Sequence, residues 1–309
     1  MLHKPAAREP TVPGPAPTRF VADVLRSTRP RQWVKNAFVL AALVFASKLG
    51  QPLLVARAVA ALLLFCLLSA SIYLLNDAAD AEADRRHPLK ASRPIAAGRV
   101  SVRNAVTLAL AGMATGLVLS ALLDYRFGLI ALGYVALMVA YTFYLKHLVL
   151  IDVFAIAGGF VLRAAAGAAV IHVSISPWLY LCTILLSLFL GFGKRRHELL
   201  LLEESARVHR RNLGEYTAEL LDDLINIVAG ATIIAYSLYT FFASAVPRQS
   251  HAMMVTIPFV LYGIFRYLLI VNRRDFGGAP EEALLRDIPL MVDLVVWAVA
   301  AEIILHYFK

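Results

Sequence analysis

Apolar residues in this chain gather into nine long runs that are separated by polar stretches. The runs cover residues 34–49, 53–75, 104–123, 127–145, 151–172, 177–193, 222–245, 252–271 and 289–307. The hydrocarbon core of a bilayer is about 30 Å thick, and an α-helix crosses it in about 20 residues. Because each run approaches that length, the pattern predicts an all-α membrane bundle of about nine transmembrane helices, of which the first is short.

Basic residues are distributed unevenly between the two sides of this predicted bundle. Most of the Lys and Arg residues lie in the N-terminal stretch and in the polar stretches 76–103, 146–150, 194–221 and 272–288. Stretches that carry the excess of Lys and Arg face the cytoplasm. We therefore expect a multi-pass protein of the cell (inner) membrane, with the N-terminus and the functional surface on the cytoplasmic side.

Composition narrows the class of protein further. The chain of 309 residues is 60% hydrophobic and 17% charged, which is too apolar for a water-soluble domain of this length. Its net charge of +9 is interpreted as a signal for orientation and for contact with anionic head groups, and no nucleic-acid partner is expected. The two cysteines, Cys66 and Cys182, lie inside apolar runs, which excludes a disulfide framework and a cysteine-based metal site.

The N-terminal part divides into a leader and a short helix. Residues 1–18 hold five prolines and no apolar run, which is typical of a disordered segment and not of a signal peptide. In the following segment Phe20, Val21, Val24 and Leu25 share one helical face, which predicts an interfacial helix. Residues 19–309 are expected to form a single transmembrane domain.

Three aspartates at the end of the second apolar run carry the clearest chemical signal. Asp77, Asp80 and Asp84 are spaced i, i+3 and i+7, which places them on one face of a helix. Stacked carboxylates repel one another unless a cation joins them, and Mg²⁺ prefers such hard oxygen ligands and is often shared with substrate phosphates. The alternative is a solvated acidic helix end that Arg85 and Arg86 balance.

Arg163 is an unusual residue for its position in the fifth apolar run. A lipid-facing arginine near the middle of a span costs at least ~2.5 kcal/mol. Asp152, eleven residues earlier on the same helix, would lie ~16 Å away and is too distant for an ion pair. We expect Arg163 to face a polar cavity, with a ligand phosphate or an acidic residue of another helix as its partner.

The motif Asn76-Asp77-x-x-Asp80-x-x-x-Asp84 resembles the first aspartate motif of the UbiA superfamily of intramembrane prenyltransferases. The resemblance covers nearly the whole chain from Arg29 onward, and it implies a UbiA-like bundle whose cytoplasmic loops cap a central cavity. Its further markers, which are fairly specific in their order and spacing, are the segments Arg29–Asn36, His87–Gly98 with Arg93-Pro94-Ile95, Tyr141–Lys146, Gly158–Ala164 and Gly193–Leu199.

One feature departs from the usual pattern of that superfamily. Typical members carry a second Asp-rich motif in the loop after the sixth helix, but this loop has no matching D-x-x-x-D. It begins with Lys194 and Arg195 and continues with Arg207, Arg210 and Arg211. Direct cationic contacts would then replace part of the metal bridging, which suits a donor with several separate phosphates. The alternative is an ordinary positive-inside loop without a ligand.

Within the superfamily the sequence is most similar to the phosphoribosyltransferase branch. This similarity implies an Mg²⁺-dependent enzyme that transfers the 5-phosphoribosyl group of phosphoribosyl pyrophosphate (PRPP) to a polyprenyl (decaprenyl) phosphate and releases pyrophosphate, for cell-wall arabinan precursors. It implies that Asp77, Asp80 and Asp84 are the catalytic and metal-binding residues. The substrate-binding residues that we expect are Gln32, Lys35, Asn36, Asn76, Arg85, Lys90, Arg93, Tyr141, Lys146, Arg163, Lys194, Arg195 and Glu198.

Two other functions stay open at this point. An ordinary UbiA prenyltransferase would move a prenyl group from a prenyl diphosphate to an aromatic acceptor, but it should carry the second Asp motif. A carrier or flippase for a phosphorylated lipid would use the same basic cavity, but it has no need of three stacked carboxylates. The lipid bilayer is the expected environment in each case, and a homo-oligomer is compatible with all three.

Overall fold

The computed structural model describes residues 17–46, 48–87, 90–174, 177–202, 215–242, 251–272 and 287–307. Within these ranges all regular structure is helical, which confirms the predicted all-α class. The long helices are α3 (Pro52–Ala79), α5 (Val102–Leu123), α6 (Tyr125–Phe143), α7 (Ile151–Val170), α8 (Pro177–Leu202), α10 (Ala218–Phe242), α11 (Ile257–Asn272) and α13 (Ile288–Tyr307). The shorter elements are α1 (Pro17–Ser27), η1 (Pro30–Leu40), α2 (Ala41–Phe45), α4 (Ala81–Arg86), η2 (Leu145–His147) and η5 (Ala252–Thr256).

Eight helical segments in the described part of the chain are long and apolar enough to cross a membrane. They correspond to eight of the nine predicted segments. Several helices extend beyond the apolar run that predicted them, and α8 continues through Lys194 to Leu202. Charged residues such as Lys, Arg and Glu are good helix formers, so a helix does not end where its apolar run ends.

The first predicted segment, 34–49, differs from the expectation of an α-helix. It forms the eleven-residue 3₁₀ helix η1 followed by the five-residue helix α2. A 3₁₀ helix rises about 2.0 Å per residue and an α-helix about 1.5 Å, so the two elements together reach roughly 30 Å. This length includes residues 30–33, which precede the predicted run, so the segment of roughly bilayer thickness is 30–45 and not 34–49.

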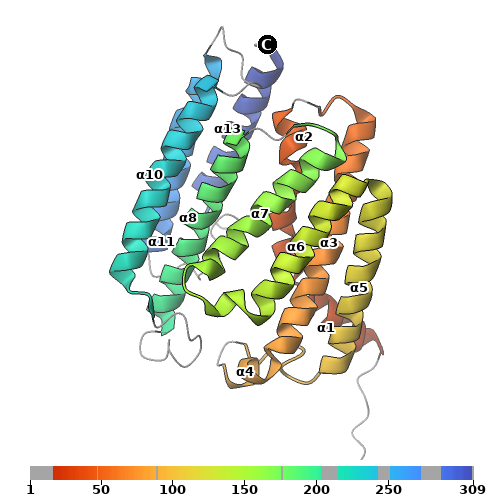
Figure 1. Ribbon diagram of the computed structural model, residues 1–309. Coiled ribbons are helices and arrows are strands. Elements are labelled where there is room, and N and C mark those ends of the chain that lie inside the picture. The colour runs from red at the N-terminus through yellow and green to blue at the C-terminus, as the bar shows by residue number, and fades with distance from the viewer. Residues whose placement is uncertain are drawn as a thin grey trace, which may run out of the picture.

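The helices run alternately up and down, so their connections gather at the two ends of the bundle (Figure 1). We call the end at which α3 stops and α4 lies the aspartate end. The helices α8 and α11 also stop at this end, and α7, α10 and α13 start there. The last residues of α13 lie at the opposite end (Figure 1).

Helix α7 joins the two halves of the bundle. One buried apolar cluster is formed by η1, α2, α3, α5, α6 and the C-terminal half of α7, with the rings of Phe65 and Tyr134 in contact. A second cluster is formed by the N-terminal half of α7 together with α8, α10 and α11, with Phe189 and Tyr267 in contact. Because α7 contributes to both clusters, it fixes the position of the aspartate-bearing half relative to the α8 half.

The first predicted helix of the chain is confirmed as α1. Phe20 and Val24 pack against the first apolar cluster, whereas Val21 and Leu25 stay more than half exposed. The apolar face that the sequence predicts therefore covers the core with one edge and leaves the other for a lipid interface.

Candidate active site

The three predicted aspartates lie where α3 passes into α4. Asp80 stands between the two helices, and the backbone bonds Asp80 N–Asn76 O (2.9 Å) and Asp84 N–Asp80 O (2.8 Å) continue the i to i+4 pattern across the junction. The predicted helical spacing is therefore retained through a slight break. Asp77 and Asp84 are buried, with 3% and 4% of their surface exposed.

Arg93 joins the two buried carboxylates. Its Nη1 donates to Asp84 Oδ2 at 2.6 Å and to Asp77 Oδ1 at 3.2 Å. Lys90 Nζ lies 4.0 Å from the other oxygen of Asp84. Because the Arg93 nitrogen lies between oxygens of Asp77 and Asp84, the position between these two carboxylates favours a cation.

Arg29 is a further cation at Asp77 that the sequence analysis did not assign to the site. Its guanidinium pairs with Asp77 Oδ1 and lies over the ring of Tyr73, with Cζ 5.1 Å from the centroid. The backbone of Arg29 is left-handed (φ 52°) directly before Pro30 and η1. The available signal was the position of Arg29 a few residues before an apolar run, next to a proline, but no spacing rule connects it with a residue 48 positions away.

Asp80 has other partners than Asp77 and Asp84 have. It pairs with Lys146 Nζ from η2, and Asn76 Nδ2 donates to its second oxygen at 3.1 Å. This ion pair connects the end of α3 with the turn between α6 and α7. The structure thus places Asn76 and Lys146, both predicted site residues, at Asp80.

The residues present fit a divalent metal in their chemistry. Within the described ranges no three His, Cys, Asp or Glu side chains come together closely enough to hold a metal ion as they stand. Asp77 and Asp84 nevertheless direct hard oxygen atoms at one cationic position, which Arg93 occupies here. Two such carboxylates, with substrate phosphate and water as further ligands, are the kind of donor set that Mg²⁺ takes.

Among the described residues the side-chain partners of Arg163 are an amide and a phenol, and no acidic side chain there pairs with it. Its Nε donates to Asn36 Oδ1 (2.8 Å) and its Nη2 to Tyr134 Oη (2.7 Å), and the guanidinium lies over the rings of Tyr134 and Phe160. Amide and phenol oxygens together with two aromatic faces stabilise a cation without a counter-ion. Asn36 also donates to Ser69 of α3 at 3.0 Å. Arg163 and Asn36 therefore connect η1, α3, α6 and α7 inside the bundle.

Arg195 lies in a second buried network at the aspartate end. Its Nε donates to Asp152 Oδ2 at 2.8 Å and its Nη1 to Glu198 at 2.5 Å, and the side chain is 2% exposed. Both Arg195 and Glu198 are predicted substrate ligands, and in the structure Arg195 pairs with Glu198 and with Asp152. The network fastens the end of α8 to the start of α7.

Tyr216 completes this network from the start of α10. Its hydroxyl accepts from Leu150 N (2.7 Å) and donates to Asp152 Oδ1 (3.2 Å). Leu150 has φ 66° and ψ −47°, and Ile151 N bonds to Val149 O at 2.8 Å, which defines a γ-turn, a rare and strained conformation. Burial raises the pKa of Tyr216 to about 12, so its hydroxyl keeps the proton that it donates. Sequence reasoning missed Asp152 and Tyr216 in this role.

The remaining predicted site residues either hold a loop or are partly exposed. Arg85 Nε donates to the carbonyl of Ala96 at 3.1 Å and holds the loop before α5. The partly exposed residues are Gln32 and Lys35 on η1, Tyr141 on α6 and Lys194 on α8. Arg207, Arg210 and Arg211 lie outside the described residues.

The sequence and the fold are both similar to those of known proteins. The sequence matches the UbiA prenyltransferase family over residues 36–281. It is 35% identical to the decaprenyl-phosphate phosphoribosyltransferase of Mycolicibacterium smegmatis, over 96% of this chain and 95% of that protein. It is 37% identical to the protein of the same name from Corynebacterium glutamicum, over 91% and 86% of the two chains. The fold is similar to that of a UbiA homologue from Archaeoglobus fulgidus solved with GPP and Mg²⁺, with a TM-score of 0.69 and 20% identity, over 92% of this chain and 99% of the other.

Proposed function

The chain belongs to the UbiA prenyltransferase family, and from this premise we propose that it transfers the 5-phosphoribosyl group of PRPP to a polyprenyl phosphate and releases pyrophosphate. The observation that carries the proposal is similarity over nearly the full length to proteins named decaprenyl-phosphate phosphoribosyltransferase. The arrangement of carboxylates and cations around Asp77 supports the same reaction, because a diphosphate leaving group needs positive charge close by.

Asp77 and Asp84 are the residues that we expect to hold Mg²⁺ together with the donor. The bound ion would supply the charge that stabilises the departing pyrophosphate. Arg93 then leaves the two carboxylates and its guanidinium can bind the diphosphate in a bidentate manner. Arg29, held over Tyr73, is positioned to make a similar change of partner.

Lys146 and Lys90 add charge on either side of this position. Lys146 pairs with Asp80, whose side chain is about a third exposed, so a phosphate can compete for the ammonium group. Lys90 is about two-fifths exposed and contacts Asp84 only at 4.0 Å. We expect both lysines to bind donor phosphate oxygens.

The acceptor needs little activation in this reaction. A phosphate oxygen of the lipid attacks C1 of the ribose, the C1–O bond to pyrophosphate breaks, and the acceptor oxygen is already anionic. No strong general base is required, and the side chains have to orient the two substrates and exclude water.

Arg163 and Arg195 act through other residues in this proposal. Arg163 holds Asn36 and with it η1, whose first turn follows Arg29. Arg195 holds the start of α7 against the end of α8, next to Lys194. Both are positioning residues, and Lys194 is the residue of the α8 end that we expect to contact phosphate.

The positive-inside distribution favours a cytoplasmic location for the aspartate end of the bundle. Of the described residues in the predicted basic stretches, Lys90, Arg93 and Lys146 contact the aspartates at this end, so the donor would enter from the cytoplasm. The acceptor's apolar chain would leave sideways between helices into the bilayer.

A two-tube transfer experiment tests the function. Purified protein with Mg²⁺ and polyprenyl phosphate receives labelled PRPP in one tube, and in the second tube purified protein with Mg²⁺ receives a prenyl diphosphate and an aromatic acid. We expect lipid-linked phosphoribose in the first tube and no product in the second, and EDTA should abolish the product. Product in the second tube alone would support an ordinary prenyltransferase instead, and no product in either tube with specific lipid-phosphate binding would support a carrier.

A further inference from the structure

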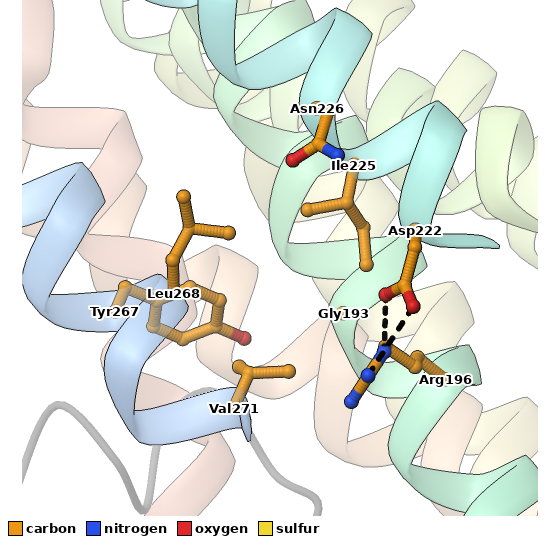
Figure 2. Close-up of a pocket in the computed structure, with 8 residues that line it drawn as sticks. All are labelled: Gly193, Arg196, Asp222, Ile225, Asn226, Tyr267, Leu268 and Val271. Atoms are coloured by element: carbon orange, nitrogen blue, oxygen red, sulfur yellow. Dashed lines mark hydrogen bonds and ion pairs between the residues drawn. The ribbon is translucent and has the colours of Figure 1, made fainter. Parts of the chain in front are cut away.

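A pocket of about 260 Å³ lies at the aspartate end between α8, α10 and α11 (Figure 2). Arg196 and Asp222 form one wall, and Tyr267 points its hydroxyl toward the space from the opposite wall (Figure 2). Gly193 lies beside this hydroxyl, and a Cβ there would come within 3.2 Å of Tyr267 Oη. The missing side chain therefore helps to keep the pocket open.

Arg196 differs from its neighbour Arg195 in how firmly its counter-ion is held. Arg195 pairs with Asp152, and both side chains are at most 2% exposed. Arg196 forms a two-nitrogen fork with Asp222, whose carboxylate side chain is 44% exposed. An exposed carboxylate forms a weak ion pair because water competes for it. Another anion can therefore displace Asp222 from Arg196, whereas Asp152 stays on Arg195.

The remaining walls of the pocket are mostly apolar. Ile225 from α10 and Leu268 and Val271 from α11 line it, and Asn226 adds one amide (Figure 2). Asp222 is in the second turn of α10 and Val271 is next to the last residue of α11. A cationic fork with apolar walls, at the ends of membrane-spanning helices, suits an anion that is attached to a hydrocarbon chain better than a free sugar phosphate.

We propose that this pocket binds the phosphate group and the first isoprene unit of a lipid phosphate, with Arg196 as the phosphate ligand and Asp222 as the group that occupies Arg196 when no lipid is bound. The identification of this lipid with the acceptor rests on the proposed transferase function. Binding of the lipid itself does not, because it can be measured without PRPP.

Neutralising Arg196 and neutralising Asp222 should change the affinity for a lipid phosphate in opposite directions. Arg196→Gln removes the charged donor, so the affinity for a lipid phosphate should fall about tenfold or more. Asp222→Asn removes a competing and repelling carboxylate, so the affinity should rise severalfold. A purely structural ion pair predicts that both changes weaken binding or that neither does.

Arg266→Gln provides a matched control variant. Arg266 makes the same two-nitrogen fork, with Asp287 at 3.0 and 2.8 Å, but it does not line the pocket. Loss of this fork should leave the affinity for the lipid phosphate within twofold of wild type.

Equilibrium binding of radiolabelled farnesyl phosphate to the full chain in detergent is the primary measurement, with farnesol, inorganic phosphate and PRPP as competitors. We expect farnesyl phosphate to bind, farnesol not to compete, and excess PRPP to leave the signal from this pocket unchanged. The assignment would be overturned by unchanged binding in Arg196→Gln, by weaker binding in Asp222→Asn, or by full competition from PRPP, which would place a donor phosphate in the pocket.

Transfer kinetics link the pocket to the reaction. Arg196→Gln should raise the KM for polyprenyl phosphate about tenfold and leave the KM for PRPP within twofold. A wild-type protein that binds farnesyl phosphate through Arg196 but transfers nothing from PRPP would contradict the proposed function and leave the pocket assignment standing. A raised KM for PRPP alone would contradict the pocket assignment.

Discussion

Arg93 lies where a metal ion would be expected between Asp77 and Asp84. Buried carboxylates need a compensating charge, and removal of one member of a buried ion pair is costly because it leaves the other uncompensated. In the structure the guanidinium of Arg93 supplies that charge through contacts of 2.6 and 3.2 Å. The metal and Arg93 should therefore compete for the same two oxygens.

Arg93→Met should tighten the binding of Mn²⁺ alone and weaken the binding of pyrophosphate. Loss of the competing cation leaves Asp77 and Asp84 free for the metal, whereas loss of the guanidinium removes a phosphate donor. We expect a change of about tenfold in each direction, measured by electron paramagnetic resonance of Mn²⁺ and by calorimetry with pyrophosphate.

Arg86→Met is the control for this comparison. Arg86 pairs with Glu82 at 2.7 Å, but both side chains are almost four-fifths exposed. Mn²⁺ affinity should be the same as in wild type. Equal effects of the Arg86 and Arg93 variants would show that general charge, and not the bridge between the carboxylates, sets the metal affinity.

Asp77→Asn should abolish transfer while the protein stays folded. The substitution removes a charged oxygen ligand, and loss of one group that stabilises developing charge reduces kcat by about a hundredfold or more. Initial rates with saturating PRPP and Mg²⁺ measure the change, and the thermal unfolding midpoint in detergent serves as the folding control. Activity within tenfold of wild type would rule out Asp77 as a metal ligand.

At the scale of helices, close approach between η1 and α7 determines where the site residues of η1 lie. Gly167 faces the carbonyl of Val39, and a Cβ at residue 167 would fall 1.8 Å from that oxygen. Only glycine, which has no Cβ, lets the two backbones approach so closely. Small residues are generally found where membrane helices pack closely. The same contact keeps Asn36 within reach of Arg163.

Gly167→Ala should therefore destabilise the protein and weaken transfer. The added methyl group forces η1 and α7 apart, and forcing extra volume into a packed contact typically costs about 1–3 kcal/mol. Thermal unfolding in detergent measures the loss of stability. Gly133→Ala is the matched control, because nothing lies within 4 Å of a Cβ on that helical glycine, and alanine there should stabilise the protein slightly.

The network around Tyr216 is the second element-level connection. Tyr216→Phe leaves the amide of Leu150 without its acceptor and takes one donor from Asp152. Loss of a partner from a buried polar group costs about 1–3 kcal/mol. The unfolding midpoint should fall while the affinity for Mn²⁺ stays unchanged, because Asp77 and Asp84 lie outside this network. A change in Mn²⁺ affinity with an unchanged midpoint would contradict that separation.

At the scale of the whole molecule, α1 and the last turn of α13 lie at opposite ends of the bundle (Figure 1). This arrangement predicts that η1 and α2 cross the membrane together as a ninth segment, beside the eight long apolar helices of the described residues. A tag before α1 should be protected in intact cells, and a tag after α13 should react with an impermeant reagent. Protection of both tags, or reaction of both, would show that the η1–α2 segment does not cross.

The sequence by itself determined the features that depend on local pattern. Long apolar runs must satisfy their backbone polar groups inside the membrane, so eight of the predicted segments became helices. The aspartate spacing predicted one face of a continuous helix for Asp77, Asp80 and Asp84, and the structure keeps the helical course with a break at Asp80. The order of the motifs was enough to indicate the family, which the comparisons confirmed.

Only the tertiary structure decided which charges meet. Arg29 reaches Asp77 across 48 residues, and Arg163 reaches Asn36 across 127, so no local pattern could predict either pair. Asp152 as a partner of Arg195 was likewise not predicted, because it is the packing of α8 on α7 that brings those side chains together. The 3₁₀ form of η1 also escaped the sequence pattern, since apolar periodicity reports which face is buried and not how tightly a helix is wound. Periodicity is a local property of the chain, whereas a buried charge takes its partner from whatever the packed helices place beside it.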